Sequence, residues 1–239
     1  MPSTLTRTIG TFERPWLNRH YQRFAGRFQL DAASGLYFDC DTPAAHRKLI
    51  SATFLQAPKT LRDVAIYLGL TVSTTDMPGT LSGSLSAVYG SWDSADHSRI
   101  SPHLEMTTIS LTPEFVFPHL VHECSHLFWA IQSKAAKARF TREMLDIVVH
   151  SFVEVTDYAQ DYFDEWQELL GQEIPFIQQR RNRALDQWVL ESFCESVAKL
   201  CCPPYKQKEG RQTDNLLEAR QALIAEHFDL VLENQFALV

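Results

Sequence analysis

The feature that most constrains this chain is the pentapeptide His122-Glu-Cys-Ser-His126, which has the pattern H-E-x-x-H. Positions four apart lie on the same face of an α-helix, so both imidazoles can reach one metal ion. Glu123 follows the first histidine and leans toward the same side of the helix, where a general base is needed. The pattern predicts a zinc site that activates water for hydrolysis.

The residues around the pentapeptide favour a helix preceded by a strand. Residues 127–131 are apolar and helix-compatible, and neither Gly nor Pro interrupts them before the polar residues 132–137. Residues 107–112 alternate and are rich in β-branched side chains, which is typical of a strand. We expect residues 112–114 to cap the helix and Pro118 to lie in its first turn. The alternative is a core helix whose histidines have ordinary hydrogen-bond partners.

A catalytic zinc usually takes three protein ligands, so the chain should supply one more. The best candidate is Glu191, in the helical stretch 188–200, where Glu195 follows four residues later. Two carboxylates on one face of an otherwise apolar helix are costly to bury unless positive charge meets them. Zinc and its imidazoles would provide that charge.

Other residues compete for the place of third ligand. His150, Glu154 and Asp157 form one polar stripe at helical spacing, in a helix expected to begin near Thr141. The simpler interpretation of this stripe is a solvated or ion-paired face. Two further alternatives are His119, one turn before His122, and Cys194. For His119, the simpler interpretation is a partly exposed residue at the start of the helix.

The pairing of HECSH with a later helix containing ESFCES resembles the gluzincins, the thermolysin-like zinc metallopeptidases, and is similar in particular to the peptidases related to anthrax lethal factor. This resemblance implies that His122, His126 and Glu191 are the zinc ligands and that Glu123 is the general base. It also implies that Glu195 orients a ligand histidine. One departure is bulky Phe193 after Ser192, since many gluzincins carry a small residue after the ligand glutamate.

Peptide hydrolysis also needs a group that stabilises the oxyanion of the tetrahedral intermediate. Gluzincins supply it from a Tyr or His outside the two motifs, and Tyr158 and Tyr162 are the candidates here, with His150 third. For each tyrosine taken alone, the simpler interpretation is an amphipathic core residue with its hydroxyl at the edge.

The composition of the chain limits which binding partners and which cellular compartment we expect. A chain of 239 residues with 45% hydrophobic content can bury a full core without a metal. The net charge of −7 argues against nucleic acid as the main partner, and no apolar run is long enough to span a membrane. Five cysteines without a C-x-x-C pair, and residues 1–10 without an apolar signal segment, predict a cytoplasmic protein. Delivery as an effector without a cleaved signal also fits.

The remaining pattern predicts an α+β, zincin-like fold, in which a small N-terminal mixed sheet packs on the H-E-x-x-H helix and a helical C-terminal half follows. We expect residues 1–25 to be disordered and 26–239 to form one catalytic domain. Its sheet and active-site helix would occupy 26–135, and its helical lobe, with the third ligand, 136–239.

Individual elements follow from local pattern. We expect a hairpin of 28–30 and 36–40, a helix over 42–56, a buried central strand over 64–72 and a strand over 85–92. The segments 74–83 and 93–103 should be loops, and a last helix should span 216–231. Residues 85–92 are our choice for an exposed edge that pairs with a substrate strand, with 107–111 as the alternative.

These observations predict a zinc-dependent peptidase with one Zn²⁺ per chain, acting on a protein or peptide, with nucleic acid and membrane excluded as partners. Hydrolysis of a non-peptide amide would use the same water activation. A third hypothesis is a catalytically inactive binding or effector protein that keeps the zincin fold. The sequence leaves the oligomeric state and the substrate open.

Overall fold

A computed structural model describes most of the chain, and its described residues are 28–75, 84–89, 100–108, 111–148, 157–202, 214–228, 230 and 232. The chain divides into two compact units, with the boundary between Ile131 and Gln132, and each unit is described by itself. The division expected from the sequence lies a few residues later, between 135 and 136. The expected disordered segment 1–25 falls outside the described residues.

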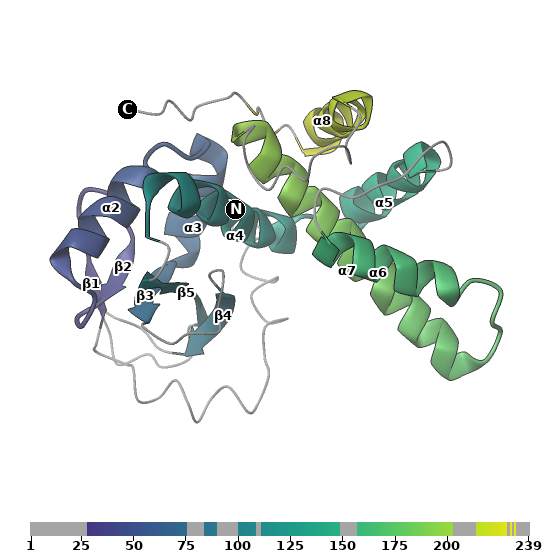
Figure 1. The fold of residues 1–239 in the computed structure, drawn as a ribbon, viewed down its shortest axis with the longest axis horizontal. Coiled ribbons are helices and arrows are strands. Elements are labelled where there is room, and N and C mark those ends of the chain that lie inside the picture. The colour runs from purple at the N-terminus through teal and green to yellow at the C-terminus, as the bar shows by residue number, and fades with distance from the viewer. Residues whose placement is uncertain are drawn as a thin grey trace, which may run out of the picture. The chain divides into compact units, whose positions relative to one another are not determined.

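Within the described residues, the first unit contains a mixed five-stranded sheet with the order β1-β2-β3-β5-β4 (Figure 1). The hairpin β1-β2 is antiparallel, β2-β3 and β3-β5 are parallel, and β4 runs antiparallel to β5. The strands are β1 (Phe28–Leu30), β2 (Tyr37–Asp39), β3 (Thr71–Thr75), β4 (Ser84–Tyr89) and β5 (Ile100–Thr107).

The expected N-terminal hairpin is confirmed, and its turn is fixed by side chains. Gly35 has a φ of 77°, in the left-handed region that glycine adopts without steric cost. The carboxylate of Asp31 accepts hydrogen bonds from the backbone N–H and the hydroxyl of Ser34 and from the hydroxyl of Ser51. These bonds lower the pKa of Asp31.

The helix expected over 42–56 is also present, as α2 (Ala44–Phe54), and its N-cap is Pro43. The central strand expected over 64–72 is wrong, because most of that segment belongs to α3 (Lys59–Leu68). Leu61, Ala65 and Leu68 are buried at helical spacing, and Gly69 ends the helix with a φ of 71°. The strand β3 begins only after this cap.

The strand before the H-E-x-x-H helix is shifted relative to the expectation. It is β5 at 100–107, not 107–112, so the loop expected over 93–103 is wrong for residues 100–103. The strand expected over 85–92 is confirmed for β4, while 90–92 lie outside the described residues. Its edge position is also confirmed, since β4 pairs only with β5 in the described sheet.

Cross-strand register gives the sheet two distinct faces. Phe38 pairs with Val72 and Val72 with Leu104, and all three are fully buried on one face. The helices α2 and α3 both pack against α4 (Pro113–Ile131), and Figure 1 shows the three helices beside the sheet. The opposite face carries the row Tyr37, Thr71 and His103.

The second unit is helical in its described residues. Its helices are α5 (Lys134–Val148), α6 (Asp157–Glu168), α7 (Pro175–Cys201) and α8 (Asp214–Phe228). The helix expected to begin near Thr141 therefore begins seven residues earlier, at Lys134. The helices expected over 188–200 and 216–231 are confirmed as parts of α7 and α8, although α8 ends at Phe228.

Aromatic side chains hold the helices of the second unit together. Trp188 of α7 stacks on Trp166 of α6, with ring centroids 5.8 Å apart, and also contacts Phe163. Phe193 of α7 meets Phe140 of α5 edge to face. The chain is thus an α+β protein, mostly helical, with a small mixed sheet. None of the helices in the described ranges is long and apolar enough to span a membrane.

Candidate metal centre

The helix α4 carries the H-E-x-x-H pentapeptide in its second half. It begins at Pro113, where a missing N–H costs nothing, and Val116 N–H donates to the Thr112 carbonyl. Pro118 lies inside the helix and not in its first turn, so this expectation is wrong. The expectation that the helix continues past the pentapeptide is confirmed, because α4 ends at Ile131.

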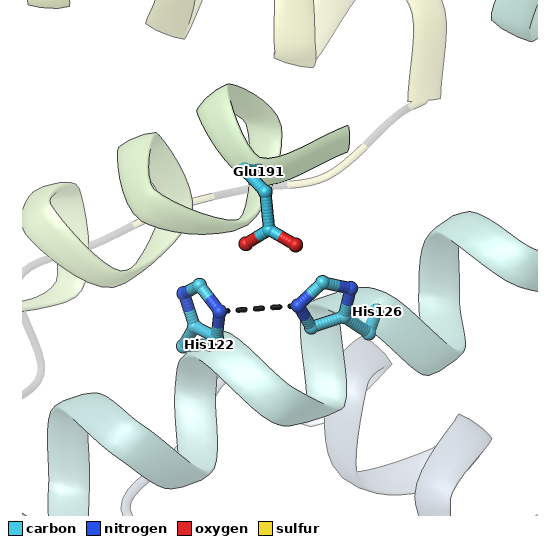
Figure 2. Close-up of side chains that lie close together, drawn as sticks. All are labelled: His122, His126 and Glu191. Carbon is cyan, nitrogen blue, oxygen red and sulfur yellow. Dashed lines mark hydrogen bonds between the residues drawn. The ribbon is translucent and has the colours of Figure 1, made fainter. Parts of the chain in front are cut away.

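The two histidines of the pentapeptide point their Nε2 atoms at each other, as the dashed line in Figure 2 shows. The Nε2 atoms of His122 and His126 are 3.1 Å apart, and the rings are inclined at 71°. In a neutral pair, one Nε2 must carry a proton and donate to the other. Two facing Nε2 lone pairs are equally the arrangement that a metal ion requires.

Glu123 lies between the histidines in sequence and is buried, with 8% of its surface exposed. The next residue, Cys124, is fully buried, and burial raises the pKa of its thiol strongly, with a further contribution from the negative charge of Glu123. Cys124 is therefore a neutral thiol. A thiolate metal ligand or nucleophile at this position is disfavoured.

His119 lies one turn before His122 but has a structural role of its own. Its Nδ1 is 2.7 Å from the carbonyl oxygen of Phe115, and its ring stacks on the Phe115 ring at 4.0 Å. Only 6% of its surface is exposed, so the expectation of a partly exposed residue is wrong.

In the second unit, α7 buries a row of charged side chains at helical spacing. Glu191 and Glu195 are 5% and 1% exposed, and Lys199, one turn further, is 7% exposed. Cys194, the minor alternative ligand, is fully buried on the same helix. The burial of both carboxylates agrees with the prediction that they face the interior and not the solvent.

Arg220 of α8 is a buried cation that the sequence interpretation missed. It is 1% exposed, and its Nη1 donates to Ser196 Oγ of α7 at 3.4 Å. A signal was available, since Arg220 precedes the buried Ile224 and Phe228 by four and eight residues. An arginine in register with an apolar stripe indicates a buried partner.

The two tyrosines proposed for oxyanion stabilisation both lie on α6. For Tyr158 the structure describes only the backbone, so its role stays a prediction. Tyr162 lines a surface groove with the first half of α7, including Ala184, two turns before Glu191. His150 and Glu154 lie outside the described residues, and only the backbone of Asp157 is described.

A second group of possible metal ligands lies in the second unit, between α5 and α8. One ligand atom from each of Glu143, Glu226 and His227 lies within 4.8 Å of the others. His227 Nε2 is 2.8 Å from Glu143 Oε2, a hydrogen bond that accounts for this pair without a metal. This group provides a control for metal-binding experiments.

Comparison of the chain with protein-family models, with curated proteins and with solved structures found no match in any of the three.

Proposed function

We propose that the protein is a zinc-dependent peptidase of the gluzincin type, with His122, His126 and Glu191 as ligands and Glu123 as general base. The observation that supports this most is the pair of facing imidazoles on α4, whose Nε2 atoms are 3.1 Å apart. The third ligand in this proposal, Glu191, is a buried carboxylate on α7 of the second unit. Because α4 and α7 belong to different units, the binding of one metal ion by all three residues is part of the proposal.

The donor set suits zinc in type and in spacing. Two imidazoles and one carboxylate are a ligand combination found in catalytic zinc sites, which leave the fourth position open. With Zn–N distances of about 2.0–2.1 Å and a near-tetrahedral angle, two nitrogen ligands lie roughly 3.1–3.4 Å apart. The measured separation of the Nε2 atoms of His122 and His126 is 3.1 Å.

Zinc bound there would supply Lewis acidity, which lowers the pKa of water and polarises a carbonyl group. The protein supplies the proton transfers. The Glu123 carboxylate accepts the proton of the attacking water and passes it to the leaving amine. Its burial limits competition from bulk water for that proton. In this proposal, Glu195 accepts a hydrogen bond from a ligand imidazole and fixes its orientation.

Two other functions use the same fold differently. An amidohydrolase for a non-peptide substrate would share the water activation, and only the substrate distinguishes it from a peptidase. An inactive binding protein would not need a general base. The intact Glu123 within the histidine pair favours an enzyme.

The experiment separates metal binding from turnover. Zinc content is measured by mass spectrometry on protein purified without added zinc, and turnover on a peptide library. We expect one equivalent of zinc in wild type and in Glu123→Gln, with turnover reduced about 10²- to 10⁴-fold in the variant, as expected for loss of a general base. His126→Ala and Glu191→Ala should lose zinc.

His227→Gln is the matched control, because it disrupts the other group of possible ligands and should leave both readouts unchanged. Wild-type protein that holds less than about a tenth of an equivalent and takes up none on titration would contradict the zinc site. Unchanged zinc affinity in Glu191→Ala would remove this residue from the ligand set. Zinc binding without cleavage of any peptide would favour the amidohydrolase or the binding protein.

A further inference from the structure

A surface groove of about 480 Å³ lies between α6 and the first half of α7, within the second unit. Tyr162 and Glu165 of α6 line it, together with Phe176, Arg183 and Ala184 of α7. Ala184 is the most buried of these residues, at 2% exposed. The volume is sufficient for one or two amino-acid side chains of a ligand.

The groove contains an uncompensated positive charge. Arg180 also lines it, and its Nε donates to Glu165 Oε1 at 2.5 Å, so these two charges neutralise each other. Arg183 has no hydrogen-bond or ion-pair partner in the described part of the chain, and its side chain is exposed. A guanidinium without a described partner, beside one that is paired, is a suitable site for a carboxylate.

An exposed aromatic ring adjoins this charge. Phe176 is 74% exposed, the highest value among the large hydrophobic residues that the structure describes. Leu170 and Ile174, in the turn that leads into α7, are also at least half exposed. An exposed aromatic ring that lines a groove gains free energy when a partner removes it from water. The groove therefore offers a cation and an apolar surface side by side.

We propose that this groove binds a peptide segment in which an acidic side chain lies next to an apolar one. Arg183 receives the carboxylate through its planar, bidentate donors. The ring of Phe176 packs against the apolar side chain. The proposal that the groove binds substrate rests on the proposed peptidase function. The proposal that it binds a peptide can be tested separately.

The position of the groove on α7 predicts where a substrate would carry its acidic residue. Ala184 and Glu191 are seven residues apart, which places them on the same helix face, about 10 Å apart along the axis. An extended peptide advances about 3.3 Å per residue. The acidic residue should therefore lie about three or four residues from the bond that is cleaved.

The test compares two peptides that differ only in charge, acetyl-Phe-Glu-amide and acetyl-Phe-Gln-amide. Binding is measured by NMR titration on full-length Glu123→Gln protein with zinc removed by a chelator, so neither turnover nor the metal contributes. We expect the Glu peptide to bind about 3- to 10-fold more tightly, as for a solvent-exposed charge-assisted pair. Arg183→Gln should abolish the difference, and Arg183→Lys should keep part of it.

Two further variants separate the groove from general charge and folding effects. Arg139→Gln removes an exposed arginine of α5 and should change nothing. Phe176→Ala should weaken the binding of both peptides equally. Because Phe176 is exposed, its replacement should not unfold the protein, so the weaker binding can be assigned to the groove. Equal affinity for both peptides, or an unchanged difference in Arg183→Gln, would overturn the proposal. 3-Phenylpropionate should bind more weakly; binding as tight as the Glu peptide would assign the groove to free organic acids instead.

Cleavage distinguishes this proposal from the peptidase function. Charge-dependent binding without cleavage of a peptide library by zinc-loaded wild type would support the groove and contradict the peptidase. Cleavage without any preference for an acidic residue three or four positions away would support the peptidase and overturn the role of the groove in substrate binding.

Discussion

His103 on β5 makes the stability of the first unit depend on pH. Thr71 Oγ1 donates its single proton to the Pro102 carbonyl at 3.0 Å, so it can only accept from His103 Nδ1, which is 2.9 Å away. Ser73 Oγ lies 2.9 Å from Nε2 and donates to it. The neutral imidazole thus has both nitrogens satisfied, and we expect the Nδ1–H tautomer.

Burial lowers the pKa of His103 from 6.5 to about 4. The folded state therefore binds fewer protons than the unfolded chain between pH 4 and 6.5, and stability is lost as the pH falls through this window. The loss relative to neutral pH amounts to about 2 kcal/mol at pH 5 and approaches about 3 kcal/mol below pH 4.

The assay is an NMR titration of the histidine rings, with His103 assigned from the spectrum of His103→Gln. Hydrogen exchange of the β3 and β5 amides, corrected for intrinsic rates, reports the stability of the sheet at each pH. His103→Gln should flatten the dependence between pH 4 and 6.5, whereas His46→Gln on α2 should leave it unchanged. Titration of His103 near 6.5, or equal slopes in wild type and His103→Gln, would refute the reasoning.

Two further predictions concern the candidate metal centre and the thiols. Glu195→Gln should weaken zinc affinity or activity by roughly 10- to 100-fold, the effect of losing a group that orients a ligand; equilibrium dialysis measures this, and equality with wild type would exclude that role. Alkylation of the native protein at pH 8 should modify Cys40 first, because it is exposed, whereas burial protects Cys124 and raises the pKa of Cys201 to about 12. Peptide mapping identifies the modified thiol, and early labelling of Cys124 would contradict its burial.

The helices that carry the candidate ligands could be predicted because their local pattern agrees with their final environment. In α4 and α7, apolar residues recur over several turns, and the ligand candidates are the polar exceptions within them. Such long, periodic segments specify their own conformation. The proposal that Glu191 joins the two histidines at one metal ion rests on ligand type and on the resemblance to gluzincins, because no local pattern links segments so far apart in the sequence.

The segment 64–72 shows where a continuous apolar run misleads. Its buried residues Ala65 and Leu68 continue the helical spacing that begins at Leu61, which lies among polar residues. Ile66 and Tyr67, on the other side of the helix, are over 40% exposed. Gly69 is a helix stop signal, and the β-branched residues that follow it begin the strand β3. The run is thus the end of one helix and the start of a strand.

The strand β5 could not be located from its own residues. Its polar residues His103 and Glu105 alternate with the buried Leu104 and Met106, but Pro102 argues against a strand in a single sequence. What makes His103 acceptable is the pair of hydroxyls on β3, Thr71 and Ser73, some 30 residues earlier. Contacts of this separation are set by the fold as a whole.

The buried cations near Glu191 and Glu195 weaken one argument for a zinc site, so the histidine pair becomes the main one. From the sequence, burial of Glu191 and Glu195 on an apolar helix demanded positive charge, and zinc with its imidazoles was the expected source. The second unit itself supplies two buried cations, Lys199 and Arg220. Two cations can balance two carboxylates without a metal ion, so burial of the glutamates does not require zinc. The facing Nε2 atoms of the histidine pair on α4 do call for a shared proton or a shared metal ion. The zinc titration therefore tests the histidines first and Glu191 second.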